Sequence, residues 1–311
     1  MSWVPVVDLQ ASDAVDAVAD ACRRVGFLTV VGHGVDLDVL DGAWNTAQQF
    51  FDLPMEAKMA VAMPRPGYPY GYSPLAGETL AASLGNRSHP DLKQSFAIGP
   101  VDAATHTFAD PDEEFAWSPN LWSSAVPHMR TAWETYYREM AALSARLLSV
   151  MARALALPAD HFEPMIHRHT SAMRALDYPP VTSALEGQLG ASAHSDYGTL
   201  TVLQADTTQR GLQVQGPGGE WLDATPEPGS LVVNLGDAMA RWTNDHWRST
   251  MHRVVVPERR RQSIAFFHNA NWDAVIDCIP SCLAHGEIPR YPPIEAGPHL
   301  MQKFRATVNG Y

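Results

Sequence analysis

Hydrophobic and polar residues follow two different periods along the chain, and the change falls near residue 171. Before this point apolar residues recur every three or four positions, which is typical of amphipathic helices. Ser12 has the chemistry of an N-cap, and Gly26 that of a residue just past a helix end. The pattern predicts helices at 12–26, 37–52 and 127–157, and short strands at 5–9 and 27–34.

After residue 171 apolar and polar residues alternate, as side chains do on the two faces of a strand. The GPGG sequence at 216–219 predicts a tight hairpin turn between two of these segments. Short strands separated by turn residues favour a sandwich or barrel over a parallel sheet. Strands are predicted at 171–178, 199–205, 211–215, 220–224, 230–236, 250–256 and 262–269.

The helical front half has no obvious closed core of its own. Residues 62–92 are rich in Pro, Gly, Ser and Tyr, so they are expected to form a loop that covers the surface. We therefore expect a mainly β protein in which helices flank a β core, with residues 1–311 forming a single domain. The long helix at 127–157 is too continuously apolar for a surface helix and is expected to back the core.

The formal net charge of the 311 residues is −12, which argues against nucleic acid or an anionic membrane as partner because both attract a basic face. The start of the chain lacks the features of a secretory signal, and no apolar stretch approaches the roughly 18 residues of a membrane span. Cys278 and Cys282 lack the second pair that a zinc site would need. Reduced thiols in a cytoplasmic protein are the expectation.

The pattern His-x-Asp occurs twice, at His89–Asp91 and at His194–Asp196. A tripeptide this short is common by chance, so its context decides. The first pair lies in a polar, proline-broken stretch and is interpreted as a loop. The second pair borders a predicted strand, which would place both side chains on one face, and Gly198 beside it is expected to leave room for a ligand.

A third metal ligand is expected from His252, which lies in an alternating segment and can point inward from the opposite sheet. Two imidazoles and one carboxylate leave coordination positions open on the metal. Such a set suits Fe(II) better than structural zinc, whose ligands come from the protein alone. The open positions suit O₂ and a chelating co-substrate.

Arg261 and Ser263 follow His252, and along a strand the two residues would share one face. A guanidinium and a hydroxyl pointing inward would form a clamp for a carboxylate, although a structural salt bridge is the alternative. Arg259 and Arg260 are interpreted as solvated turn residues. Asn234 and Asp237 are expected to organise a strand end and its turn, while Trp242 and Trp247 are expected in the core.

Taken together, these residues resemble the isopenicillin N synthase-like branch of non-haem Fe(II), 2-oxoglutarate-dependent oxygenases. The segments GFLTVVGHGV at 26–35, DYPP at 177–180 and NLGDAMARWTNDHWRSTMHRV at 234–254 resemble signatures of that family. The resemblance covers nearly the whole chain. It assigns residues 1–125 to an N-terminal family region and residues 165–285 to a jelly-roll core that binds Fe(II) and 2-oxoglutarate.

The resemblance implies a double-stranded β-helix, or jelly roll, with Fe(II) held by His194, Asp196 and His252. It implies 2-oxoglutarate and O₂ as co-substrates, with Arg261 and Ser263 binding the far carboxylate of 2-oxoglutarate. The activity implied is hydroxylation, desaturation or cyclisation of a small organic metabolite, with release of succinate and CO₂.

Tyr178 occupies the family's Tyr-Pro position and is expected to hydrogen-bond the co-substrate. Plant members usually carry Asn two residues before this tyrosine, where this chain has Leu176. Because isopenicillin N synthase uses the same Arg-x-Ser pair to hold its substrate, three alternatives stay open. These are an oxidase independent of 2-oxoglutarate, an ethylene-forming type of activity, and a cupin-like metal-binding module.

The sequence does not identify the substrate or the oligomeric state. Substrate contacts are expected from residues 62–92, from the front-half strands and from the segment after 285. Candidates are Tyr70, Lys93 and Arg174, although a surface ion pair is the favoured interpretation of Arg174.

Overall fold

The computed structural model describes residues 3–65, 67–77, 80, 89–102, 104–181 and 184–307. The helices are α1 (Ala14–Arg24), α2 (Leu37–Phe51), α3 (Met55–Met59), α4 (Pro111–Ala116), α5 (Met129–Ala154), α6 (Glu163–Ile166), α7 (Asp237–Trp242) and α8 (Ala296–Thr307), with a short 3-10 helix at Pro280–Cys282. The strands are β1 (Val6–Asp8), β2 (Phe27–Val31), β3 (Gly71–Ser73), β4 (Gln94–Ile98), β5 (Ala172–Tyr178), β6 (Ala191–His194), β7 (Leu200–Ala205), β8 (Leu212–Gln215), β9 (Trp221–Asp223), β10 (Leu231–Leu235), β11 (His252–Val254), β12 (Arg261–His268), β13 (Val275–Ile276) and β14 (Ile294–Glu295).

The strands build a major and a minor sheet. The major sheet has the order β1-β2-β10-β7-β12-β5-β4-β3, and the minor sheet has the order β6-β11-β8-β9. Neighbouring strands in these sheets are antiparallel except β1 and β2, which are parallel. Apolar side chains from both sheets, such as Leu176, Val214 and Val254, share one buried cluster. The architecture is the predicted mainly β jelly roll with flanking helices.

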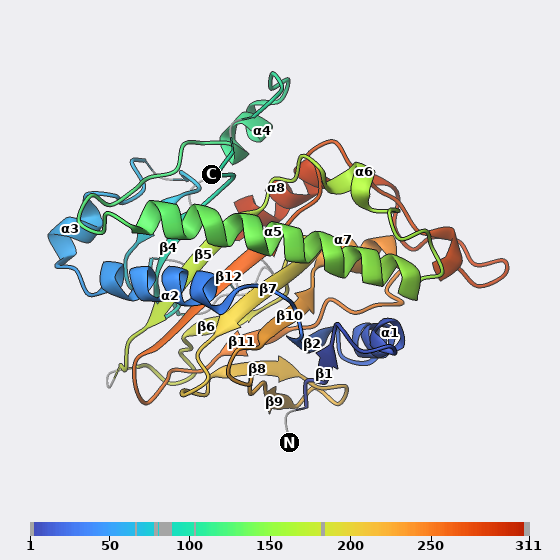
Figure 1. The fold of residues 1–311 in the computed structure, drawn as a ribbon, viewed down its shortest axis with the longest axis horizontal. Helices are drawn as coiled ribbons and strands as arrows, with labels where there is room; N and C mark the ends of the chain where they lie inside the picture. Colours follow the sequence, from blue (N-terminus) through green and yellow to red (C-terminus); the bar gives the residue numbers. More distant parts are fainter. Residues whose placement is uncertain are drawn as a thin grey trace.

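A layer of helices covers the outer face of the major sheet. Helix α5 lies across that sheet, with α2 alongside one half of it and α1 packed near its other end (Figure 1). The buried residues of α5 recur every three or four positions, for example Met140, Leu143 and Leu147. They pack in one cluster with Val202 and Phe266 of the sheet. This layer seals one face of the major sheet, so the other face is available to line a site.

The two halves of the chain share the major sheet. β2 pairs with β10 at one end of the sheet, and β4 pairs with β5 near the other. Because these hydrogen bonds connect residues before 100 with residues after 170, the front half is built into the β core.

The structure confirms most of the predicted elements and corrects two details. The residue before α1 is Asp13, whose side chain makes no capping hydrogen bond, so Ser12 is not the N-cap. The predicted cover loop contains the buried strand β3, and β4 follows it. Local alternation does not reveal β3 because only three residues pair there. Positions 81–88 of that predicted loop lie outside the described residues.

Candidate active site

His194 and His252 are direct neighbours across two paired strands. β6 and β11 are antiparallel, and His252 lies opposite His194 in their register. The two ring centroids are 4.3 Å apart. His252 points into the cavity as predicted, but it does so from the same sheet as His194 and not from the opposite one. Alternation shows which residues share a strand face, but it does not show which sheet a strand joins.

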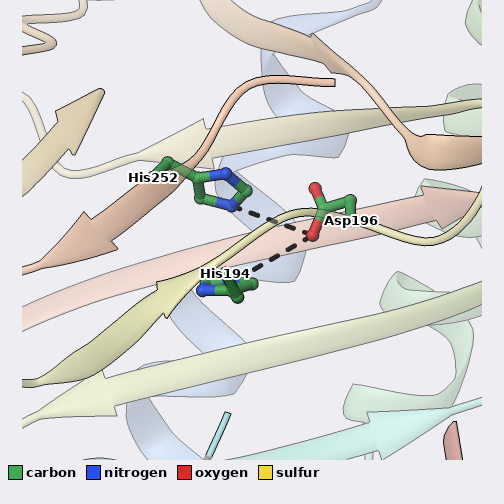
Figure 2. A group of neighbouring side chains, drawn as sticks. All are labelled: His194, Asp196 and His252. Atoms are coloured by element: carbon green, nitrogen blue, oxygen red, sulfur yellow. Dashed lines mark ion pairs between the residues drawn. The ribbon is translucent and has the colours of Figure 1, made fainter. Parts of the chain in front are cut away.

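Asp196 lies just beyond β6 and brings a carboxylate to the two rings. Its Oδ1 is 3.9 Å from Nε2 of His194 and 3.8 Å from Nε2 of His252. Figure 2 shows these two approaches meeting at a single carboxylate oxygen. The potential ligand atoms of the three residues all lie within 4.8 Å of one another.

The second oxygen of Asp196 is held by the major sheet. Thr201 on β7 donates to Oδ2 at 2.6 Å, and the Asn234 amide on β10 donates to it at 2.7 Å. These bonds turn Oδ1 toward the histidines. Asn234 was predicted to organise a strand end, whereas it orients this carboxylate. The sequence assigned no role to Thr201, which the register of β7 and β10 places opposite Asn234.

Backbone carbonyls determine which nitrogen of each ring carries the hydrogen in its neutral form. Nδ1 of His194 donates to the carbonyl of Ser192 at 2.7 Å, and Nδ1 of His252 donates to that of Thr250 at 3.2 Å. A carbonyl only accepts hydrogen bonds, so in each neutral ring the lone pair sits on Nε2. Both lone pairs therefore face the Asp196 carboxylate, as ligand atoms for a cation require.

The electrostatics of the group favour a bound cation. Burial, followed by repulsion from His252, lowers the pKa of His194 to about 4. Burial would raise the pKa of Asp196, but the two imidazoles and the hydrogen bonds from Asn234 and Thr201 together lower it. The site therefore presents a neutral imidazole and an ionised carboxylate near pH 7, which is the protonation state that a metal ion needs. The donor set fits Fe(II).

A buried cation lies deeper between the sheets. Arg261 is 2% exposed, and burial lowers its pKa. It lies opposite Tyr178 in the register of β12 and β5, and the Tyr178 hydroxyl interacts with both Arg261 and Ser263. Among the described residues, Nε and Nη1 of Arg261 have no hydrogen-bond partner. A buried guanidinium with unpaired nitrogens fits an anionic ligand, because leaving such a group unpaired is costly.

A cavity of about 530 Å³ joins these groups. The three candidate metal ligands, Arg261, Ser263 and Tyr178 all line it. Apolar side chains form most of the remaining wall, and they come from both sheets, from α4 and from α8. The lining includes residues from 62–92, from the front-half strands β2, β3 and β4, and from the segment after 285, which are the regions expected to contact the substrate, and strand β5 contributes as well.

The three candidate substrate contacts also line this cavity. The Tyr70 hydroxyl donates to the carbonyl of Ala116 at 2.5 Å. The Lys93 ammonium is paired with Asp91 at 2.9 Å. Arg174 lies on the cavity side of β5, where its neighbours across the sheet are Ala97 and Ala265.

Other sequence predictions have mixed outcomes. Trp242 and Trp247 are buried in the core, as predicted. The interpretation of Arg260 as a solvated turn residue is wrong, because its guanidinium forms ion pairs with the Asp52 and Asp177 carboxylates. Gly198 lies in the cavity lining. A Cβ atom there would lie 2.3 Å from the carbonyl oxygen of His268, so the glycine permits a close approach of two backbones.

The cysteines and the helices add two observations. Within the described part of the chain, Cys278 and Cys282 join no group of three or more potential metal ligands. Over the same ranges, none of the helices combines the length and apolarity that crossing a membrane requires.

Family comparisons agree with this geometry. Residues 4–125 match the family described as non-haem dioxygenase in morphine synthesis N-terminal. Residues 166–270 match the 2OG-Fe(II) oxygenase superfamily. The second matched region contains the three candidate metal ligands together with Arg261 and Ser263.

Individual relatives extend the likeness over nearly the whole chain. The chain is 35% identical over 287 residues to the 2-oxoglutarate-Fe(II) type oxidoreductase hxnY of Emericella nidulans, covering 90% of this chain and 80% of that protein. It is 32% identical over 306 residues to the homoarginine-6-hydroxylase 2-ODD-233 of Oryza sativa subsp. japonica, covering 96% and 90%. The crystal structure of a full-length Neurospora crassa protein in complex with alpha-KG matches with a TM-score of 0.84 at 28% identity, covering 97% of this chain and 96% of that one.

Fold and comparisons together define a non-haem oxygenase that requires iron and an oxo acid. The chain belongs to the 2OG-Fe(II) oxygenase superfamily. It is an oxidoreductase whose cofactors are Fe(II), 2-oxoglutarate and O₂.

Proposed function

We propose that His194, Asp196 and His252 bind the Fe(II) of this oxygenase. The observation that carries the assignment is that both Nε2 lone pairs and Oδ1 of Asp196 face one point, while each remaining polar atom of the three side chains is held elsewhere. Three protein ligands leave metal positions for O₂ and for a chelating co-substrate.

We propose that Arg261 and Ser263 bind the far carboxylate of 2-oxoglutarate and that the Tyr178 hydroxyl supports them. The unpaired nitrogens of the buried Arg261 support this role. Burial raises the pKa of Tyr178, so its hydroxyl keeps its proton, which is available for the co-substrate carboxylate while the oxygen accepts from Arg261. Leu176, which replaces the Asn of plant members, offers no polar group on this wall.

When bound, Fe(II) and 2-oxoglutarate supply oxidation of a substrate C–H bond by O₂, with release of succinate and CO₂. The chain's own residues hold and orient the reactants. Thr201 and Asn234 fix the ligand oxygen, and the carbonyls of Ser192 and Thr250 fix the imidazoles. The apolar cavity wall excludes water from the reacting groups.

We propose that the substrate is a small organic molecule rather than nucleic acid. The cavity volume and apolar wall suit such a molecule, and relatives include the homoarginine-6-hydroxylase and the Neurospora crassa protein, which was also crystallised with thymine. Arg174 is the proposed contact for a polar or anionic group of the substrate, with Tyr70 and Lys93 shaping the same wall.

We further propose that residues 1–311 act as one catalytic domain in the cytoplasm. The hydrogen bonds between β2 and β10 support a single domain, and the three unpaired cysteines support a reducing compartment. Within that domain, residues 1–125 would form the N-terminal region and residues 165–285 the jelly-roll core.

An anaerobic titration with Fe(II) and then 2-oxoglutarate tests the site assignment. We expect a visible charge-transfer band that requires both additions. His194→Ala should abolish the band by preventing iron binding. Arg261→Leu should weaken 2-oxoglutarate binding by tenfold or more while iron still binds.

Arg260→Leu is the matched control, because Arg260 is the preceding arginine and pairs with Asp52 and Asp177 away from the cavity. It should lower thermal stability and leave the 2-oxoglutarate affinity unchanged. Equal losses of co-substrate affinity in the Arg260 and Arg261 variants would contradict the assignment.

A further inference from the structure

A buried carboxylate outside the candidate ligand set is tied to the metal site. Asp91 is 0% exposed. Its Oδ1 accepts hydrogen bonds from the Ser192 backbone N–H at 2.8 Å and from the Ser192 hydroxyl at 2.6 Å. Its Oδ2 accepts from the Lys93 ammonium at 2.9 Å and from the Leu80 backbone N–H at 3.1 Å. Both carboxylate oxygens are thus fully used.

Ser192 connects this carboxylate to a candidate iron ligand. The N–H and hydroxyl of Ser192 bind Asp91, while its carbonyl accepts the hydrogen bond from Nδ1 of His194. The Ser192 carbonyl orients the His194 ring and keeps the hydrogen on Nδ1. Any displacement of Ser192 would therefore move this carbonyl and disturb both.

The position of β6 in the fold makes this link important. β6 is an edge strand of the minor sheet, where it pairs with β11 on one side. The segment before β4 holds the other side, through Asp91 and through a hydrogen bond from the Leu92 N–H to the Leu189 carbonyl at 2.9 Å. An edge strand that carries a metal ligand needs such an anchor, because one paired side leaves its backbone free to move.

Lys93 supplies the compensating charge. Its side chain is 2% exposed and lines the cavity, and its charge acts on both His194 and Tyr178. A buried ammonium requires a buried anion nearby. Asp91 therefore holds the ligand strand and also balances a cation in the cavity wall.

We propose that Asp91 is a positioning residue for the iron ligand His194, acting through Ser192, so that the N-terminal region completes the metal site. This inference rests on the proposed role of His194. It assigns a function to the His89–Asp91 pair of the sequence, whose aspartate anchors a ligand strand although the pair itself lies in a loop.

The test is metal affinity in the full chain, measured by anaerobic titration with Co(II) as a spectroscopic probe and repeated with Fe(II). In Asp91→Asn one carboxylate oxygen becomes an NH₂ group, which must face donors on Ser192, or on Lys93 and Leu80. We expect the dissociation constant for the metal to rise about tenfold and the Co(II) absorption bands to change shape.

Asp177→Asn is the matched control. Asp177 is also a buried carboxylate, 1% exposed, and it pairs with Arg260 and Gln94 away from the metal site. We expect this variant to lose thermal stability and to keep the metal affinity and spectrum of the unmodified protein. A purely structural role for Asp91 would give the same result in both variants, and this outcome would overturn the proposal.

Two further variants keep the test decisive if Asp91→Asn does not fold. The double variant Asp91→Asn with Lys93→Gln removes the unbalanced ammonium, and Ser192→Ala removes only the hydroxyl bond. Both should weaken metal binding, the second by less. Loss of metal binding in His194→Ala together with unchanged affinity in these variants would reject the role of Asp91 while leaving the proposed function intact. Unchanged binding in His194→Ala would instead reject the proposed function.

Discussion

The hydroxyl of Thr201 on β7 donates a 2.6 Å hydrogen bond to the Asp196 carboxylate oxygen that faces away from the two histidines. A residue of the major sheet thereby orients a candidate ligand that follows a strand of the minor sheet. The metal site consequently depends on how the two sheets are placed relative to each other.

Replacing Thr201 by valine keeps the shape of the side chain and removes this donor. The Asp196 carboxylate then keeps only one of the two hydrogen bonds that orient it. We expect iron affinity to fall by about tenfold, because losing a hydrogen-bond partner of a metal ligand weakens metal binding. Anaerobic Fe(II) titration measures the effect. The control is Thr199→Val, because Thr199 is buried nearby but bonds to His268 instead. Equal affinities in the two variants would show that the Thr201 hydroxyl is not needed.

Tyr178→Phe removes the hydroxyl that reaches Arg261 and Ser263 and keeps the ring against the guanidinium, whose carbon lies 5.2 Å from the ring centroid. The co-substrate clamp should loosen, because one polar group at the buried cation is lost. We expect the KM for 2-oxoglutarate to rise about three- to tenfold, in line with a net hydrogen bond of about 1 kcal/mol. Succinate formation at varied 2-oxoglutarate gives the KM. An unchanged KM for 2-oxoglutarate would show that the Tyr178 hydroxyl does not contribute to co-substrate binding.

Acid should destabilise the fold partly through His169. Burial lowers the pKa of this residue to about 4 in the folded protein. In the unfolded chain an imidazole has a pKa near 6.5, so between about pH 6.5 and 4 the unfolded state binds more protons. The free energy of unfolding should therefore fall as pH decreases, by at most about 1.4 kcal/mol per pH unit from this group. Chemical denaturation at pH 7 and pH 4.5 should show a smaller fall in His169→Gln than in the unmodified protein. The same fall in both would exclude this histidine as a cause.

Two glycine substitutions should act in opposite directions. In Gly198→Ala the added Cβ would overlap the His268 carbonyl, and we expect a loss of about 1–3 kcal/mol in the free energy of unfolding. In Gly42→Ala the added Cβ on α2 meets nothing closer than Ala132 at 4.0 Å, and we expect a gain of about 0.5–1 kcal/mol from helix propensity. Urea denaturation of the two variants checks both signs. A stabilised Gly198→Ala would mean that the two backbones can separate freely.

The sequence alone determined the elements and the chemistry of the candidate site. The period of the apolar residues located most helices and strands, because burial on one face leaves a repeating pattern in the chain. The side-chain types and spacing of four residues indicated two kinds of ligand. His194 and Asp196 indicated a metal cation, and Arg261 and Ser263 indicated a carboxylate, because polar and charged side chains are costly to bury without a partner.

Only the tertiary structure decided which strands are neighbours. It placed His252 beside His194 in one sheet, and it brought Thr201 and Asn234 to Asp196 and Asp91 to Ser192. These contacts join residues from 5 to 101 positions apart. A local pattern specifies which way a side chain faces on its own strand, whereas its partner is set by long-range pairing and by the packing of two sheets, which leave no periodic trace in the chain.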